Sequence, residues 1–182
     1  MSSIVSLPGS AALSSFRIDK IRQEAARLGV ELGAISARYW HFLELDAELD
    51  AAAAQQLAST LDYGTPTDSP SADAVQVLVT PRPGTISPWS SKATDILRNS
   101  GLTPLRRIER GVAYRLSDPQ GAALSGQALT ALLPLLHDRM TEAVMTSLDA
   151  AHVLFQHVPP RELTTVDVKT GEIGRASCRE RV

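Results

Sequence analysis

The apolar positions of the chain follow two spacings, one typical of β-strands and one typical of helices. Strands are predicted at residues 4–7, 35–45, 75–79, 105–116 and 141–146. Helices are predicted at residues 13–28, 49–61, 88–99, 125–138 and 148–155. Residues 65–73 have the composition of an exposed loop, and an extended segment is expected from residue 158.

Details of the pattern predict how some of these elements end and which faces they bury. Pro8 and Gly9 should end the first strand, and Pro134 should kink the fourth helix or restart it. Residues 35–45 are partly apolar on both faces and should be central in a sheet. In residues 105–116, apolar side chains alternate with Arg107, Glu109 and Arg115, which predicts a strand with one wet face.

The order of the predicted elements repeats. A long strand, a helix with a leucine row, a short strand and a second helix occur twice, about 70 residues apart. Two such β-α-β-α units, each with a sheet face to bury, are expected to join into one antiparallel or mixed sheet packed with helices. The predicted fold class is therefore α+β.

Composition and charge exclude several classes of function. The chain has 182 residues, of which 43% are hydrophobic and 21% charged, and its formal net charge is -2. This balance gives no general attraction to nucleic acid or to anionic membranes, and no apolar run reaches the roughly 20 residues that span a bilayer. We expect a cytoplasmic protein without nucleic-acid or membrane partners. Cys178 is the single cysteine, so neither an internal disulfide nor a cysteine-based metal cluster is expected.

Candidate chemistry is concentrated in residues 80–95, where a strand runs into prolines and a glycine before a helix starts. Ser87 stands where an N-cap belongs and Pro88 where a first helical residue belongs. Such a helix start attracts anions. Two interpretations stay open: a contact for an anion or a partner, or an ordinary capped corner. The candidate residues are Arg82, Thr85, Ser87, Trp89, Ser90 and Lys92.

Other polar groups give weaker signals. His41, His137, His152 and His157 lack the spacing of metal ligands, and no metal site is expected. Arg106, Arg107, Arg110 and Arg115 are either a basic stripe for a phosphate or acidic partner, or a solvated strand face. We expect the second.

Several segments resemble one known family. They are LPGSAALSSFR at 7–17, ARYWHF at 37–42, the stretch 80–95, RIERGVAY at 107–114, LHDRMT at 136–141 and LTTVDV at 163–168. Together they are similar to the N-terminal region of the large, single-chain phosphoribosylformylglycinamidine synthase of purine biosynthesis. The resemblance extends over residues 4–168.

The resemblance implies a part of a larger enzyme. The parent is a glutamine-dependent C–N ligase that converts formylglycinamide ribonucleotide, with ATP, Mg and glutamine, into formylglycinamidine ribonucleotide. The resemblance also implies an N-terminal domain at residues 1–157, similar to a fused pair of small accessory subunits, and the start of a linker at 158–168. Its partners would be the synthetase and glutaminase domains. Residues 169–182, with Cys178, look like a vector or read-through tail.

Two hypotheses of function follow. In the first, the domain is structural and holds the glutaminase and synthetase domains in register for ammonia transfer, with the six candidate residues facing them. It then has no catalytic residue, cofactor or metal of its own. In the second, it is a free-standing regulatory module that binds an anion or nucleotide at residues 87–92.

Overall fold

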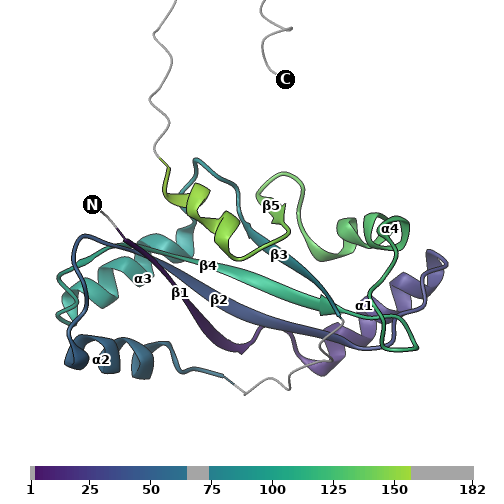
Figure 1. Ribbon diagram of the computed structural model, residues 1–182, viewed down its shortest axis with the longest axis horizontal. Coiled ribbons are helices and arrows are strands. Elements are labelled where there is room, and N and C mark those ends of the chain that lie inside the picture. The colour runs from purple at the N-terminus through teal and green to yellow at the C-terminus, as the bar shows by residue number, and fades with distance from the viewer. Residues whose placement is uncertain (1–2, 65–73, 157–182) are drawn as a thin grey trace, which may run out of the picture.

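The computed structural model describes residues 3–64 and 74–156, which form an α+β fold with a single sheet (Figure 1). The strands are β1 (Ser3–Ala11), β2 (Ile35–Leu45), β3 (Val75–Pro81), β4 (Leu105–Leu116) and β5 (Glu142–Met145). The helices are α1 (Ser15–Arg27), α2 (Ala51–Leu61), α3 (Pro88–Asn99), α4 (Gly126–Leu136) and the 3₁₀-helix η1 (Asp149–Phe155). The predicted fold class is confirmed.

The five strands lie in the order β1-β2-β4-β3-β5, and all neighbours are antiparallel. The central pair is β2 with β4, from Ile35 opposite Leu116 to Leu45 opposite Leu105. β1 lies outside β2, and β3 lies outside β4. The predicted repeat of long strand, helix, short strand and helix corresponds to β2-α2-β3-α3 and β4-α4-β5-η1. The strand pairing groups the elements differently: β1 pairs with β2 and β3 with β4, so the units of the sheet are β1-α1-β2-α2 and β3-α3-β4-α4. These two units meet along the β2–β4 pair, and β5 and η1 follow them.

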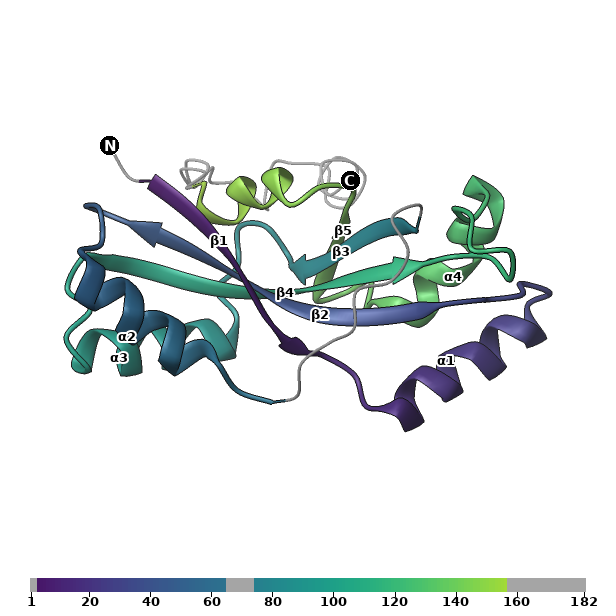
Figure 2. The same ribbon diagram turned by 60° about the horizontal axis from the view of Figure 1, so that its bottom comes forward.

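Helices α1, α2 and α3 lie on one face of the sheet and η1 lies on the other (Figure 2). The packing of its leucines with Ala25, Val77 and Val79 places α4 on the same face as α1. On the helix face, a first apolar cluster joins α1 and α4 to the sheet and a second joins α2 and α3 to it. On the other face, Ala151 and Leu154 of η1 pack on Phe42, Leu78 and Ala113 in a third cluster. Because side chains alternate between the faces of a strand, β2 and β4 contribute to all three clusters.

β1 is longer than predicted. It continues through Pro8 and Gly9 to Ala11, with an irregular register between Pro8 and Ala11. A proline is tolerated here because β1 is an edge strand, which needs backbone hydrogen bonds on one side only.

The prediction that β4 has one wet face is wrong. Glu109 is fully buried and the side chain of Arg107 is 20% exposed. β4 lies inside the sheet, and the start of α3 and the 3₁₀-helix η1 cover the face on which these two residues lie.

The last two predicted helices also differ. α4 does not restart at Pro134, which lies inside it, and the helix ends two residues later at Leu136. The segment at 149–155 is a 3₁₀-helix. The predicted loop 65–73, linker 158–168, tail 169–182, His157 and Cys178 lie outside the described residues.

Candidate functional site

The start of α3 is built as its sequence predicts. Ser87 is the N-cap, its hydroxyl accepts a hydrogen bond from the backbone N–H of Ser90 at 3.0 Å, and Pro88 occupies the first turn. The preceding loop turns at Gly84, whose φ is 82°. Thr85 closes the loop with two hydrogen bonds to the carbonyl of Arg82, from its backbone N–H at 3.1 Å and from its hydroxyl at 2.6 Å.

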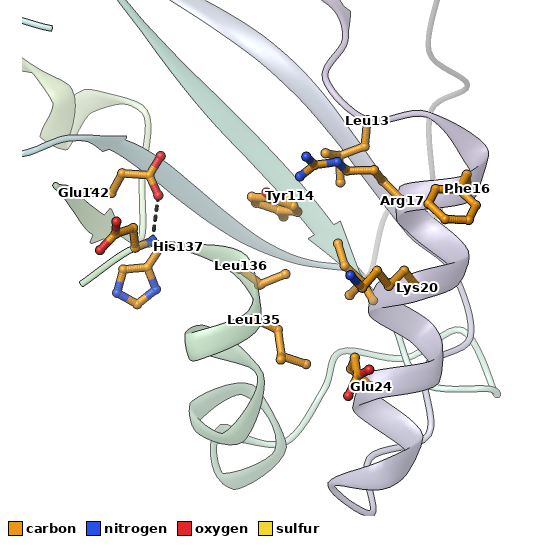
Figure 3. Close-up of a pocket in the computed structure, with 12 residues that line it drawn as sticks. Leu13, Phe16, Arg17, Lys20, Glu24, Tyr114, Leu135, Leu136, His137 and Glu142 are labelled. Carbon is orange, nitrogen blue, oxygen red and sulfur yellow. Dashed lines mark hydrogen bonds between the residues drawn. The ribbon is translucent and has the colours of Figure 1, made fainter. Parts of the chain in front are cut away.

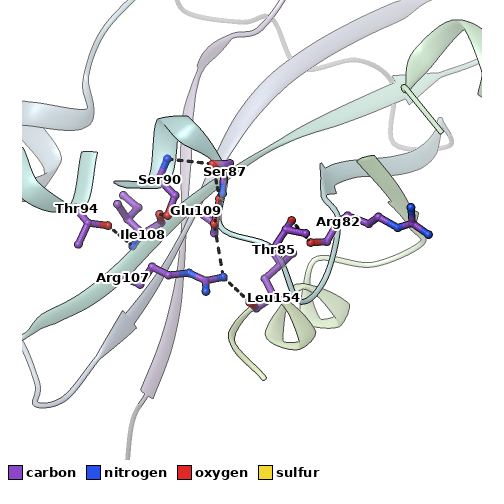
Figure 4. Close-up of polar contacts among 9 residues, drawn as sticks. All are labelled: Arg82, Thr85, Ser87, Ser90, Thr94, Arg107, Ile108, Glu109 and Leu154. Atoms are coloured by element: carbon purple, nitrogen blue, oxygen red, sulfur yellow. Dashed lines mark hydrogen bonds and ion pairs between the residues drawn. The ribbon is translucent and has the colours of Figure 1, made fainter. Parts of the chain in front are cut away.

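A carboxylate of the same chain lies at this helix start (Figure 4). The backbone N–H of Ser87 donates to Oε1 of Glu109 at 3.2 Å, and the Ser87 hydroxyl donates to Oε2 at 2.8 Å. Nη2 of Arg107 lies 3.5 Å from Oε1 and also donates to the carbonyl of Leu154. A helix N-terminus is a favourable place for negative charge, and the anion that α3 holds in this structure is Glu109.

Ser90 and Thr94 join α3 to the edge of β4. β3 pairs with β4 only from Val112 to Leu116, so the backbone of β4 before Val112 lacks that strand neighbour. There the Ser90 hydroxyl donates to the carbonyl of Ile108 at 2.6 Å, and the backbone N–H of Ile108 donates to the Thr94 hydroxyl at 3.2 Å. Two side chains of a helix thus replace a missing strand partner.

The six candidate residues do not gather at one site. Ser87 and Ser90 point into the fold, and half-buried Trp89 packs on the second apolar cluster. Arg82, Thr85 and Lys92 are exposed.

A surface hollow of about 400 Å³, here called the loop hollow, lies beside three of them. It is lined by Pro81, Arg82, Thr85, Ile86, Ser87 and Pro88 on one side and by Met140, Thr141 and Glu142 on the other. Arg82 links the two sides of the loop hollow. Its backbone N–H donates to the carbonyl of Thr141 at 3.1 Å, and its Nη1 donates to the carbonyl of Met140 at 3.3 Å. Ile86 is 59% exposed and Met140 80%.

A polar and aromatic cluster lies between the first and second apolar clusters on the helix face, and the sequence analysis did not find it. Nε2 of His41 lies 2.8 Å from the hydroxyl of Tyr63, which also accepts a hydrogen bond from Nη1 of Arg110 at 3.3 Å. The Arg110 guanidinium lies 4.2 Å from the ring centre of Tyr39 and 4.7 Å from that of Trp89. Arg110 therefore does not belong to a solvated strand face, and for this residue that prediction is wrong, whereas the side chain of Arg106 is 59% exposed. We call these five residues the His41 cluster.

His41 is neutral at physiological pH. Its burial and the nearby Arg110 charge lower its pKa to about 4. Its side chain is fully buried, and its Nδ1 has no hydrogen-bond partner among the described residues. An enclosed, neutral imidazole does not meet a substrate from solvent. The His41 cluster fastens the C-terminal end of α2 and the start of α3 to the sheet.

A second hollow, the α1–α4 cleft, has a volume of about 580 Å³ (Figure 3). Its lining comprises Leu13, Phe16, Arg17, Lys20, Ile21 and Glu24 from α1 and the residue that precedes its cap, Tyr114 from β4, and Leu135, Leu136, His137, Asp138 and Glu142 from the α4–β5 region. The α1 wall carries two cations, Arg17 and Lys20, and one carboxylate, Glu24, which is paired with Arg27 at 2.7 Å; the opposite wall carries the carboxylates of Asp138 and Glu142. Burial, with the nearby carboxylate of Glu142, raises the pKa of Tyr114 to about 12.

Within residues 3–64 and 74–156, no group of three or more His, Cys, Asp or Glu side chains is arranged to hold a metal ion. The helices of that same part of the chain include none with the length and apolar character that a membrane crossing requires.

A comparison with protein families places the chain in a class of proteins, the N-terminal domains of amidotransferases. A family model, formylglycinamide ribonucleotide amidotransferase N-terminal, matches residues 38–155, which is more than half of the chain. The chain belongs to this family, and its resemblance to the enzyme that forms formylglycinamidine ribonucleotide is confirmed.

Proposed function

We propose that this domain is the docking domain of a formylglycinamide ribonucleotide amidotransferase and holds the synthetase and glutaminase domains in register for ammonia transfer. The observation that carries the proposal is the loop hollow, where large apolar side chains are exposed on a domain that belongs to a multidomain enzyme family. The parent supplies the chemistry, with ATP, Mg and glutamine, and this domain supplies a surface.

The loop hollow has the composition of a contact surface. Exposed isoleucine and methionine side chains beside an arginine are typical of the centre of protein interfaces, where apolar area is buried on association. The backbone around them is fixed, because Arg82 joins the loop to the segment before β5 and Thr85 closes the loop on itself. A preformed surface loses less conformational entropy when a partner binds. Lys92 lies exposed on the second turn of α3 and does not line the loop hollow.

The test uses the full-length enzyme and compares glutamine hydrolysis with product formation. Ile86→Ser and Met140→Ser are expected to leave hydrolysis within about two-fold of wild type and to lower product formation by about ten-fold, a loss of about 1.4 kcal/mol in coupling. Ile96→Ser is the matched control, because Ile96 is 61% exposed on α3 and does not line the hollow. If the two variants lower both rates equally, or if Ile96→Ser uncouples them as well, the loop hollow is not the docking surface.

A substitution of Trp89 reports the stability of the domain and not its docking to the other domains. Its ring is half-buried, lies 5.7 Å from that of His41 and packs on the second apolar cluster. Trp89→Ala is therefore expected to destabilise the domain by about 3 kcal/mol, which would lower both rates of the full-length enzyme together.

A further inference from the structure

We propose that the α1–α4 cleft binds a small zwitterion, an α-amino acid with an apolar side chain. Its carboxylate would meet Arg17, Lys20 and the Tyr114 hydroxyl, and its ammonium group would meet Asp138 and Glu142. This site goes beyond the docking function and lies apart from the start of α3, where the chain's own Glu109 occupies the anion position.

The cations of the cleft are available for a ligand. Arg17 and Lys20 are three residues apart on α1 and therefore share a face. Neither side chain forms a hydrogen bond or an ion pair within the described part of the chain, and Figure 3 shows the Arg17 guanidinium pointing toward Tyr114. By contrast, Arg22 and Arg27 of the same helix pair with Asp19 at 3.0 Å and Glu24 at 2.7 Å.

Tyr114 is an independent indication of a ligand. It is 6% exposed, lines the cleft, and makes no hydrogen bond to any described residue. Its hydroxyl is not one of the buried side-chain atoms that lack a partner in the described part of the chain, so it opens to the cleft, where a ligand can reach it. Like any tyrosine hydroxyl, it is protonated at neutral pH and can donate to an anion.

The opposite wall carries fixed negative charge. Oε2 of Glu142 accepts a hydrogen bond from the backbone N–H of Asp138 at 2.8 Å, and Oδ1 of Asp138 accepts one from that of Met140 at 2.7 Å. Each carboxylate keeps a second oxygen for a ligand. A free anion would be repelled from this wall and a free amine from the wall of α1, so the cleft favours a molecule that carries both charges.

Apolar side chains complete the site. Leu13 and Ile21 on one side and Leu135 and Leu136 on the other offer contacts to an aliphatic side chain. The volume of about 580 Å³ lies in the range of small-molecule sites.

The first test titrates the 182-residue chain with L-leucine and follows binding by calorimetry. The controls are 4-methylpentanoate, which lacks the amino group of leucine, and isoamylamine, which lacks its carboxylate. Leucine is expected to bind about ten-fold more tightly than either control. If leucine does not bind up to about 10 mM, or if 4-methylpentanoate binds as tightly, the proposal is overturned.

The second test locates the site. Tyr114→Phe and Arg17→Gln are each expected to weaken leucine binding by about three- to ten-fold, because each removes one hydrogen-bond donor to the carboxylate. Their unfolding should match that of wild type, since neither donor is bonded in the structure. Arg22→Gln is the control, because Arg22 does not line the cleft. If both cleft variants bind leucine as wild type does, leucine binds elsewhere and the assignment is wrong.

Discussion

Two fully buried polar side chains, Glu109 and His41, have very different partners. Glu109 accepts two hydrogen bonds from Ser87 and lies 3.5 Å from the guanidinium of Arg107. His41 has one bonded ring nitrogen and one without a partner among the described residues. Burying a charge is costly unless it is paired, whereas a neutral imidazole is buried more cheaply. The folded domain therefore tolerates the buried Glu109 carboxylate because that carboxylate is paired. It tolerates the buried His41 ring because that ring is neutral.

Replacing the Glu109 carboxylate should destabilise the domain. Glu109→Gln removes the ion pair with Arg107 and weakens two charge-assisted hydrogen bonds, and the expected loss is about 2 kcal/mol in the free energy of unfolding. Urea denaturation of the chain measures it. Glu24→Gln is the control: its partner Arg27 is 73% exposed, and such pairs contribute at most about 1 kcal/mol. If Glu109→Gln and Glu24→Gln lowered the unfolding free energy equally, the buried Glu109 pair would contribute no more to stability than an exposed pair.

His41 should make the domain less stable in acid. Its pKa is about 4 in the folded protein and about 6.5 in the unfolded chain, so between these values the unfolded chain binds the additional proton. Unfolding free energy should therefore rise with pH from about 4 to about 6.5, by about 3 kcal/mol in total, and level off above that range.

The measurement for His41 is a series of urea denaturations across this pH range, with the NMR titration of the imidazole as a direct check. His41→Gln should remove the rise of the unfolding free energy with pH in this range. His152→Gln, at an exposed position, should leave that rise unchanged. An imidazole that titrates near 6.5 would refute the assignment.

The sequence predicted the cap of α3 but not the residue that the cap binds. Ser87 and Pro88 follow a local rule and were placed correctly. Glu109 was assigned to a wet face because alternation reports the polarity of side chains, and no local pattern reveals which distant element covers them. The His41 cluster was missed for the same reason, since Tyr63 and Trp89 reach His41 from other elements.

Helix α3 supplies hydrogen-bond partners to the part of β4 that β3 does not reach. Its Ser90 and Thr94 side chains bond the backbone of Ile108 where β3 no longer pairs with β4. Buried backbone groups need partners, and water does not reach this edge because Ser90 and Ile108 are fully buried. These two hydroxyls therefore set the position of α3 along β4.

Thr94→Val tests this role. The two side chains have the same shape, but valine leaves the buried N–H of Ile108 without an acceptor, and the expected loss is about 2 kcal/mol in unfolding free energy. Thr60→Val is the control, because the Thr60 hydroxyl bonds the Gln56 carbonyl on the exposed surface of α2. Hydrogen exchange of the Ile108 amide gives a second readout and should become faster. An unchanged exchange rate with unchanged stability would show that Thr94 does not hold this edge.

The existence and order of the elements could be predicted, because each long strand and helix carries its own periodicity. Their ends and subtypes could not all be predicted. β1 passes through Pro8 because it is an edge strand, and edge position is a property of the sheet. The segment at 149–155 forms a 3₁₀-helix, which its apolar pattern does not distinguish from one or two turns of α-helix.

For the whole molecule, the decisive feature is that the repeated units do not have separate cores. The first apolar cluster joins Ala25 and Ile35 of one unit to Leu132 of the other. The second joins Leu57 of the first unit to Leu97 and Ile108 of the second. Each unit alone would expose its own part of both clusters, together with the long edge along which β2 and β4 pair.

The domain should consequently unfold as one body. In urea, far-UV circular dichroism and tryptophan fluorescence are expected to give coincident transitions, because losing either cluster opens both units. Leu57→Ala in the second cluster and Leu132→Ala in the first should each lower the unfolding free energy by about 3 kcal/mol while the two signals still coincide. Trp89 packs on the second cluster and Trp40 on the third, so with Trp40→Phe as background the fluorescence would report the second cluster if it opened alone. A Leu57→Ala protein that loses fluorescence at a lower urea concentration than helicity would mean that the units fold independently, and that their shared clusters do not couple them.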